Sequence, residues 1–81
     1  MAINEIVGKS PSNWQIGITN DPSARKEEWA RTKNVAAWKQ WQADSLEEAQ
    51  AIERHFIHVL KMNGGTGGNT SSDGEVYVYI F

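Results

Sequence analysis

The sequence lacks cysteine altogether, which excludes both a disulfide framework and a thiolate metal site. It also lacks any apolar run of membrane-spanning length, and its N-terminal residues do not form a basic segment followed by a long apolar stretch. We therefore expect a cytoplasmic protein with no membrane partner. Its 81 residues leave room for one compact core, so we expect a single domain over residues 1–81.

A large excess of positive charge is likewise missing, because the formal net charge is −2. This balance argues against a protein that coats nucleic acid by bulk electrostatics, so any phosphate-binding site must be local. Five of the eight basic residues fall between Arg25 and Lys39, where Glu27 and Glu28 are the only acids. The stretch is either a weak phosphate-binding patch or a solvated helix face.

What the sequence does contain is a succession of short periodic segments. Ile3–Val7 is an apolar run followed by a segment dense in turn formers, residues 8–13, which favours a strand and a turn. Trp14–Thr19 alternates in the manner of a strand, with its large apolar side chains on one face. Together these two predicted strands suggest an antiparallel hairpin.

Asp21 and Pro22 mark the start of a helix. The aspartate can cap free backbone amides, and proline loses no needed hydrogen bond at the first helical position. We expect this helix to end near Thr32. In the next periodic stretch, Trp38 and Trp41 fit opposite faces of a strand better than one stripe of a helix, so residues 38–42 are predicted to be a strand.

A second helix has the clearest start in the chain. Ser45 and Glu48 have the form of a capping box, in which the serine accepts from a first-turn amide and the glutamate reaches back. From Leu46 onwards, apolar side chains recur at steps of three and four residues. This spacing predicts an amphipathic helix to about Met62, which the glycine-rich residues 63–65 then end.

The C-terminal segment Val76–Phe81 is predicted to be a strand with apolar or aromatic side chains on both faces. A strand of this kind invites association when exposed, so we expect it to pair with the sheet of its own monomer or across a homodimer. A loop rich in small polar residues, 63–74, precedes it. The elements together predict an α+β fold, with a small, mostly antiparallel sheet of three to four strands packed with two helices.

Glu53 is the most informative polar position, because it lies on or beside the apolar stripe of the second predicted helix. A buried carboxylate needs a cation, a hydrogen-bond donor or the edge of a cleft, since burying an unpaired charge is very costly. One interpretation is an ion pair with Arg25, Lys39 or Arg54 at the rim of the core. The other is a functional site.

Residues 15–25 resemble the second motif of the GIY-YIG nuclease superfamily and the arginine that follows it. The family pattern is a tyrosine, an aliphatic residue and glycine, then serine or threonine, and an arginine on the next helix. The residues that match at the family's spacing are Ile16, Gly17, Thr19 and Arg25. Further along, Ala49 and Glu53 resemble the helix on which an alanine lies four residues before a metal-binding glutamate.

The resemblance implies a GIY-YIG-like fold and the hydrolysis of nucleic-acid phosphodiesters with Mg²⁺ or Mn²⁺. Its catalytic residues would be Glu53, which holds the metal ion, and Arg25, which stabilises phosphate charge. Such roles suit these residue types, because hard divalent ions prefer carboxylate oxygen and arginine offers fixed donors to a phosphoryl group. Gly17 would let the backbone approach the phosphate closely, and Thr19 could hydrogen-bond nearby.

The chain departs from the family pattern at both signature tyrosines. Gln15 stands at the tyrosine position of the second motif, and Ile3–Val7 shows no Gly-Ile-Tyr triplet. Glutamine cannot form the phenolate that would accept a proton from attacking water. The family's downstream asparagine corresponds to Asn63 or Asn69. Two functions stay open: a metal-dependent nuclease, altered or weakened in catalysis, and a non-enzymatic module that binds nucleic acid or protein on the same fold.

Two further pairs of side chains could contribute to a site. His55 and His58 have a spacing that could hold a metal, but no third ligand follows at a matching spacing, so we expect solvated surface histidines. Tyr77 and Tyr79 share one face of the C-terminal strand and could approach a site. We expect them to be used for packing within the sheet.

Overall fold

The computed structural model describes residues 3–8, 10–64 and 74–81, so Asn69 lies outside the described residues. In chain order the elements are α1 (Ile3–Val7), the short 3₁₀ helix η1 (Pro11–Asn13), β1 (Gln15–Thr19), α2 (Pro22–Ala30), β2 (Lys39–Ala43), α3 (Leu46–His58), β3 (Asn63–Gly64) and β4 (Val76–Ile80). Within those residues, no helix is long and apolar enough to cross a membrane.

The four strands form one mixed sheet in the order β2-β4-β1-β3. β4 pairs antiparallel with β1 and β2, whereas β3 pairs parallel with β1. The predicted α+β class and the mostly antiparallel sheet are therefore confirmed, with a short parallel edge strand added. Because β4 is hydrogen-bonded on both sides, the C-terminal strand pairs within its own monomer. A homodimer built on the edge of β4 would have to displace β1 or β2.

The segment Ile3–Val7 is an α-helix, so the predicted strand and its hairpin with β1 are wrong. Ile3, Ile6 and Val7 are spaced by three and four residues, which places them on one face of a helix. Ile3 and Val7 are buried in the core and Ile6 packs against it. Gly8, with φ of +53°, ends the helix in the left-handed conformation that glycine adopts without a steric penalty.

Helix α2 begins as predicted. The Asp21 carboxylate accepts a hydrogen bond from the Ala24 N–H at 3.1 Å, and Pro22 occupies the first turn. The helix ends at Ala30, slightly before the predicted end near Thr32. This short helix places Arg25 and Trp29 one turn apart on the same side.

Helix α3 also begins as predicted, because the Ser45 hydroxyl accepts from the Glu48 N–H at 3.0 Å. Its end at His58 is earlier than the predicted end near Met62. The chain turns at Lys61, which has a φ of +63°, and the Met62 N–H then donates to the Phe56 carbonyl at 3.1 Å. The apolar spacing thus continues beyond the helix because Met62 returns to the core.

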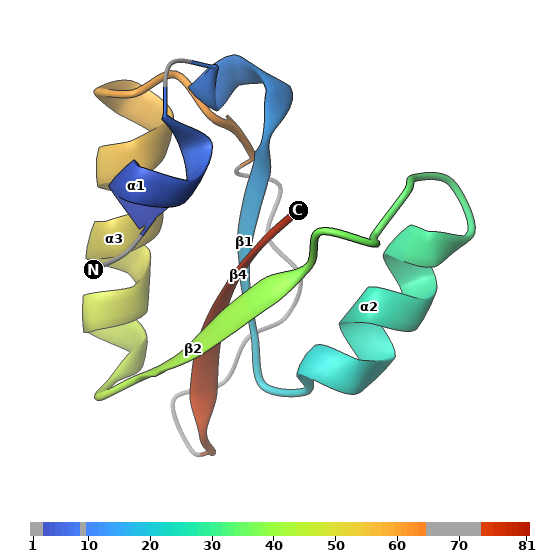
Figure 1. Ribbon diagram of the computed structural model, residues 1–81. Coiled ribbons are helices and arrows are strands. Elements are labelled where there is room, and N and C mark those ends of the chain that lie inside the picture. Colours follow the sequence, from blue (N-terminus) through green and yellow to red (C-terminus); the bar gives the residue numbers. More distant parts are fainter. Residues whose placement is uncertain (1–2, 9, 65–73) are drawn as a thin grey trace.

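The two faces of the sheet carry different partners. α1 and α3 lie on one side and α2 lies on the other (Figure 1). The core fills the α3 side, where Phe56 is buried and Trp41 and Ile52 pack at the margin. So small a domain is expected to bury its large apolar side chains in the core. Trp29 and Trp38 instead contact aromatic side chains of the C-terminal strand segment. The reason is strand alternation, which sends Tyr79 away from α3 while its neighbours Val78 and Ile80 point into the core.

Candidate functional site

The site starts from a close approach of two strands. Gly17 in β1 lies opposite Tyr79 in β4 in the antiparallel register, and both residues are buried. A Cβ atom at Gly17 would overlap the Tyr79 phenol ring, including its hydroxyl. The glycine therefore lets the ring lie across β1. The group that approaches Gly17 closely in the structure is the phenol of Tyr79, and the approach of a phosphate to this backbone stays a prediction.

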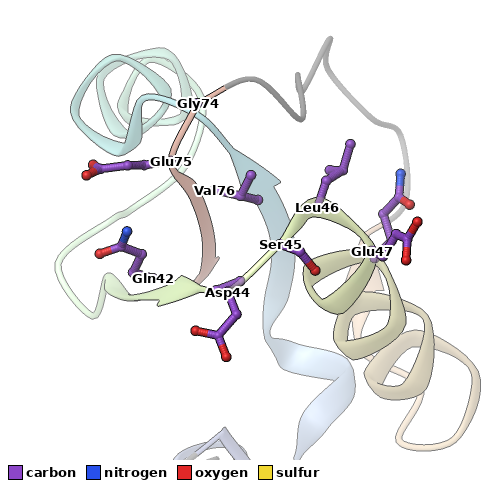
Figure 2. Close-up of a pocket in the computed structure, with 10 residues that line it drawn as sticks. Gln42, Asp44, Ser45, Leu46, Glu47, Gly74, Glu75 and Val76 are labelled. Carbon is purple, nitrogen blue, oxygen red and sulfur yellow. The ribbon is translucent and has the colours of Figure 1, made fainter.

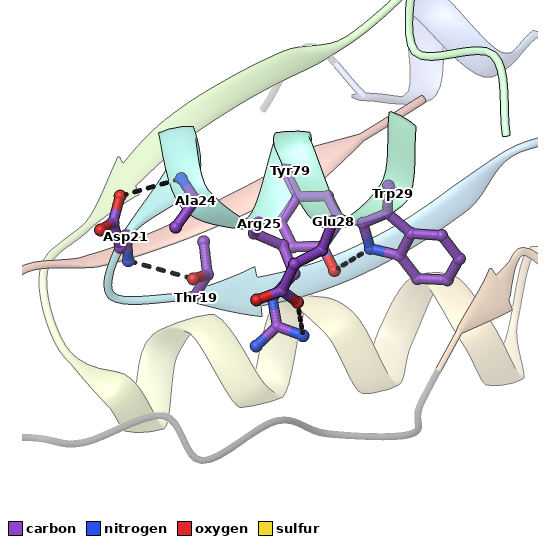
Figure 3. Close-up of polar contacts among 7 residues, drawn as sticks. All are labelled: Thr19, Asp21, Ala24, Arg25, Glu28, Trp29 and Tyr79. Atoms are coloured by element: carbon purple, nitrogen blue, oxygen red, sulfur yellow. Dashed lines mark hydrogen bonds and ion pairs between the residues drawn. The ribbon is translucent and has the colours of Figure 1, made fainter. Parts of the chain in front are cut away.

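Tyr79 is held on two sides by aromatic residues. The Trp29 indole N–H donates a hydrogen bond to the Tyr79 hydroxyl oxygen at 2.9 Å (Figure 3). The Trp38 ring stacks on the phenol, with centroids 4.5 Å apart and planes 8° from parallel. Tyr79 is only 4% exposed. These contacts leave the phenol little rotational freedom and fix where its oxygen lies.

Arg25 lies beside this phenol, on the first turns of α2 (Figure 3). Its guanidinium is 3.5 Å from the Glu28 carboxylate, and the two side chains are 25% and 61% exposed. An ion pair so exposed to solvent is weak and easily exchanged, so the guanidinium can leave Glu28 for another anion.

Glu53 lies on α3 with a partly buried side chain. Burial raises the pKa of its carboxyl group above the ordinary value. Within the described part of the chain, Glu53 makes no ion pair, and Arg25 pairs with Glu28 instead. The interpretation of Glu53 as the partner of Arg25, Lys39 or Arg54 is therefore wrong for these residues. Among the residues that the structure describes, no ion pair compensates its charge.

The phenol of Tyr79 feels the charges of both candidate catalytic residues. Burial raises the pKa of Tyr79 above its ordinary value, and the negative charges of Glu53 and Glu28 act in the same direction. The hydrogen bond from Trp29 and the positive charge of Arg25 lower it. Arg25 and Glu53, from helices on opposite sides of the sheet, thus lie within electrostatic reach of one hydroxyl group. Their catalytic roles remain predictions.

The other predicted site residues have identifiable structural surroundings. The buried Thr19 hydroxyl accepts from the Asp21 N–H at 3.0 Å and so supports the turn into α2 (Figure 3). Gln15 is partly buried at the start of β1 and lines a small cavity. The Asn63 side chain donates to the Ser12 carbonyl at 2.6 Å.

Tyr79 is the residue that sequence reasoning undervalued. The alternation of the C-terminal segment places Tyr77, Tyr79 and Phe81 on one face, and Gly17 is the one β1 residue without a side chain. Both signals are readable in the sequence. The register that joins them is not, because it pairs strands that are about sixty residues apart in the chain.

A larger cavity of about 840 Å³ lies at the start of α3 (Figure 2). Among the described residues, its charged lining is Asp44, Glu47 and Glu75, with no lysine or arginine. Such a surface repels phosphate, so this cavity is not suited to nucleic acid. Among residues 3–8, 10–64 and 74–81, no group of three or more His, Cys, Asp or Glu could hold a metal ion. His55 and His58 are exposed, as predicted.

A comparison with protein-family models, with curated proteins and with solved structures finds no match for this chain.

Proposed function

We propose that this protein is a GIY-YIG-like, divalent-metal-dependent nuclease that hydrolyses nucleic-acid phosphodiesters. The observation that carries the proposal is the uncompensated, partly buried carboxylate of Glu53, in electrostatic reach of a fixed phenol that also feels Arg25. A partly buried carboxylate with a raised pKa is typical of a functional site, because structure alone gains nothing from an unpaired buried charge.

Glu53 is the residue that would hold the metal ion. A single carboxylate suits Mg²⁺ or Mn²⁺, since Mg²⁺ keeps several waters and binds through one or two carboxylates together with substrate phosphates. The uncompensated charge of Glu53 fits such a cation. When bound, the ion supplies positive charge to the phosphoryl oxygens and the leaving oxygen.

Arg25 and Tyr79 would act on the substrate. The Arg25 guanidinium, held by Glu28 only through a weak exposed pair, can offer its planar fork to a phosphate. Tyr79 keeps its proton at neutral pH, as a phenol ordinarily does, and burial raises its pKa further, so it can donate that proton in a hydrogen bond. It would release the proton more readily once the charge of Glu53 is neutralised. Tyr79 thereby supplies a phenol that Gln15 cannot.

A cleavage assay tests this function. Labelled single- and double-stranded DNA and RNA are incubated with the protein, with Mn²⁺ and with a chelator. We expect metal-dependent products from the wild type, none from Glu53→Gln, and slower cleavage by Tyr79→Phe. Glu47→Gln, which neutralises an exposed glutamate of the same helix, is the control and should cleave normally. Equal cleavage by wild type and Glu53→Gln would refute the proposed role of the carboxylate.

The alternative function is a non-enzymatic module that binds nucleic acid or protein. It is favoured by the lack of a three-residue metal-ligand group in the described part of the chain. On this alternative, the protein binds an oligonucleotide with and without Mn²⁺, Glu53→Gln changes neither binding nor products, and no cleavage occurs. The same set of variants therefore separates the two functions.

A further inference from the structure

A small cavity lies beside the Tyr79 site on the same face of the sheet. The pairing of Gly17 with Tyr79 continues to Gln15 and Phe81, whose backbones exchange hydrogen bonds of 2.8 and 3.1 Å. Gln15 lies two residues before Gly17 in β1, so the two pairs are roughly 7 Å apart along the strand. The cavity at this point has a volume of about 160 Å³ and is lined by Asn13, Gln15, Lys33, Asn34, Asn63 and Phe81.

The lining combines four carboxamide side chains with one aromatic ring and one cation. A carboxamide carries both a donor and an acceptor, which is the combination that recognises the edge of a nucleobase. A single lysine would bind a bare phosphate only weakly. Planar groups with mixed donors and acceptors fit this lining better than an anion does.

Internal hydrogen bonds already orient two of the four amides. The Asn63 NH₂ group donates to the Ser12 carbonyl, so its Oδ1 is the atom offered to a ligand as an acceptor. The Asn34 Oδ1 accepts from the Ala36 N–H at 2.9 Å, so its NH₂ group is offered as a donor. The Gln15 amide makes no hydrogen bond to the described residues and can do both. A site prepared in this way loses less entropy on binding.

We propose that this cavity binds one base of a single-stranded nucleic acid, next to the phosphate held at Arg25. Its volume lies well below the roughly 300–1,000 Å³ of pockets for drug-sized ligands, so it suits a single ring system. The bases of a duplex are stacked and paired, so only an unpaired base can enter such a cavity and present its Watson–Crick edge there. That the ligand belongs to a nucleic-acid strand rests on the proposed function, whereas the fit of the cavity to a base rests on its lining residues alone.

Titration with free nucleosides tests the base-binding subsite without phosphate or metal. Adenosine, guanosine, cytidine and uridine are added to ¹⁵N-labelled protein, and we expect one or more to shift the side-chain amide signals of Gln15, Asn34 and Asn63. In a second measurement, Gln15→Ala should weaken binding of a short single-stranded oligonucleotide roughly tenfold, the range of one base contact. Gln42→Ala, an exposed glutamine on the same face of the sheet but outside the cavity, should leave the affinity unchanged.

An abasic oligonucleotide of the same length distinguishes base from phosphate. Wild type and Gln15→Ala should bind it equally, because it offers phosphates without bases. A tenfold loss on the abasic strand as well, or no nucleoside shift at the cavity, would overturn the subsite. Metal-dependent cleavage would then still support the nuclease. Conversely, cavity shifts without any cleavage would support the subsite and refute the nuclease.

Discussion

At the scale of single residues, Glu53 is partly buried and makes no ion pair with the residues that the structure describes. Burial disfavours the ionised form in the folded chain, so the folded-state pKa lies above the unfolded one. The folded state then binds the proton more tightly, and stability falls as the pH rises from the unfolded pKa through the folded pKa. Above that window the full penalty is present. Below it, the carboxyl group is neutral in both states.

Glu53→Gln should therefore raise the melting temperature of the metal-free protein at neutral pH. The gain should shrink as the pH is lowered through the raised pKa of Glu53 and vanish below the unfolded pKa. Thermal denaturation of both proteins across a pH series measures it, with the exposed Glu47→Gln as the control. A lower melting temperature for Glu53→Gln at neutral pH would instead indicate a stabilising partner for the carboxylate.

The hydrogen bond between Trp29 and Tyr79 sets the state of the phenol. Trp29→Phe removes the only donor that this side chain offers, and because that bond lowers the pKa of Tyr79, we expect the pKa to rise. A pH titration of the tyrosine ring-carbon signals by NMR measures the change. Trp38→Phe is the matched control, since Trp38 stacks on the phenol but donates its N–H to Gln40.

The chain has only two tyrosines, so the second one serves as an internal reference. The Tyr77 hydroxyl donates to the Glu75 carboxylate at 2.7 Å, which raises the pKa of Tyr77. Neither tryptophan variant should change this value. An unchanged Tyr79 pKa in Trp29→Phe would mean that the indole contributes packing alone.

At the scale of the elements, the local signals in the sequence were the reliable ones. The caps at Asp21 and Ser45 each bond the backbone amide three residues on, as a cap requires, and both helices begin where those residues predict. The error at Ile3–Val7 arose because five residues hold too little periodicity to separate a strand from a helix. Packing against the core decides between a strand and a helix here, and the residues of that core come from distant segments of the chain.

The end of α3 shows the same division between local and distant causes. The glycines at 64 and 65 suggested the stop, but the chain turns earlier, at Lys61, with a φ that favours glycine. The turn persists because it returns Met62 to the core, where it is 3% exposed. Tertiary packing therefore decides the boundary against local preference.

Lys61→Gly should stabilise the protein by about 0.5–1 kcal/mol. Glycine removes the steric cost of the left-handed conformation, roughly 1–2 kcal/mol, and loses part of this gain through its greater freedom in the unfolded chain. Urea denaturation measures the difference. Lys61→Ala removes the ammonium group but keeps the Cβ, so it should give no such gain. Equal stabilisation by both variants would assign the effect to charge.

At the scale of the whole molecule, the two faces of the sheet carry different groups of side chains, and Glu53 on α3 is the candidate site residue on the core side. One face carries the core with α1 and α3, while the other carries the aromatic cluster, α2 and the base-sized cavity (Figure 1). The sequence predicted the fold class and both main helices, whereas the roles of Arg25 and Glu53 stay predictions. It could not predict Tyr79 or the cavity, because both depend on β4 lying between β1 and β2.

Charge is also distributed unevenly over this frame. The cavity lined by Asp44, Glu47 and Glu75 is acidic and repels phosphate. The basic residues Arg25, Arg31 and Lys33 lie instead on α2 and the chain after it. With a net charge of −2, the protein has few basic side chains that could contact phosphates. Binding to an oligonucleotide should therefore involve few phosphate contacts and a shallow dependence on salt.

Arg25→Ala should weaken oligonucleotide binding and reduce the slope of log affinity against log salt concentration by about one, because one phosphate contact disappears. Binding isotherms at several salt concentrations, without divalent metal, measure this slope. Lys26→Ala removes the same charge from an exposed position of α2 and should change the slope less. If Arg25 acted only by packing beside Tyr79, its loss would weaken binding equally at every salt concentration. A plot of log affinity against log salt concentration that shifts without a change of slope would thus show that Arg25 does not contact phosphate.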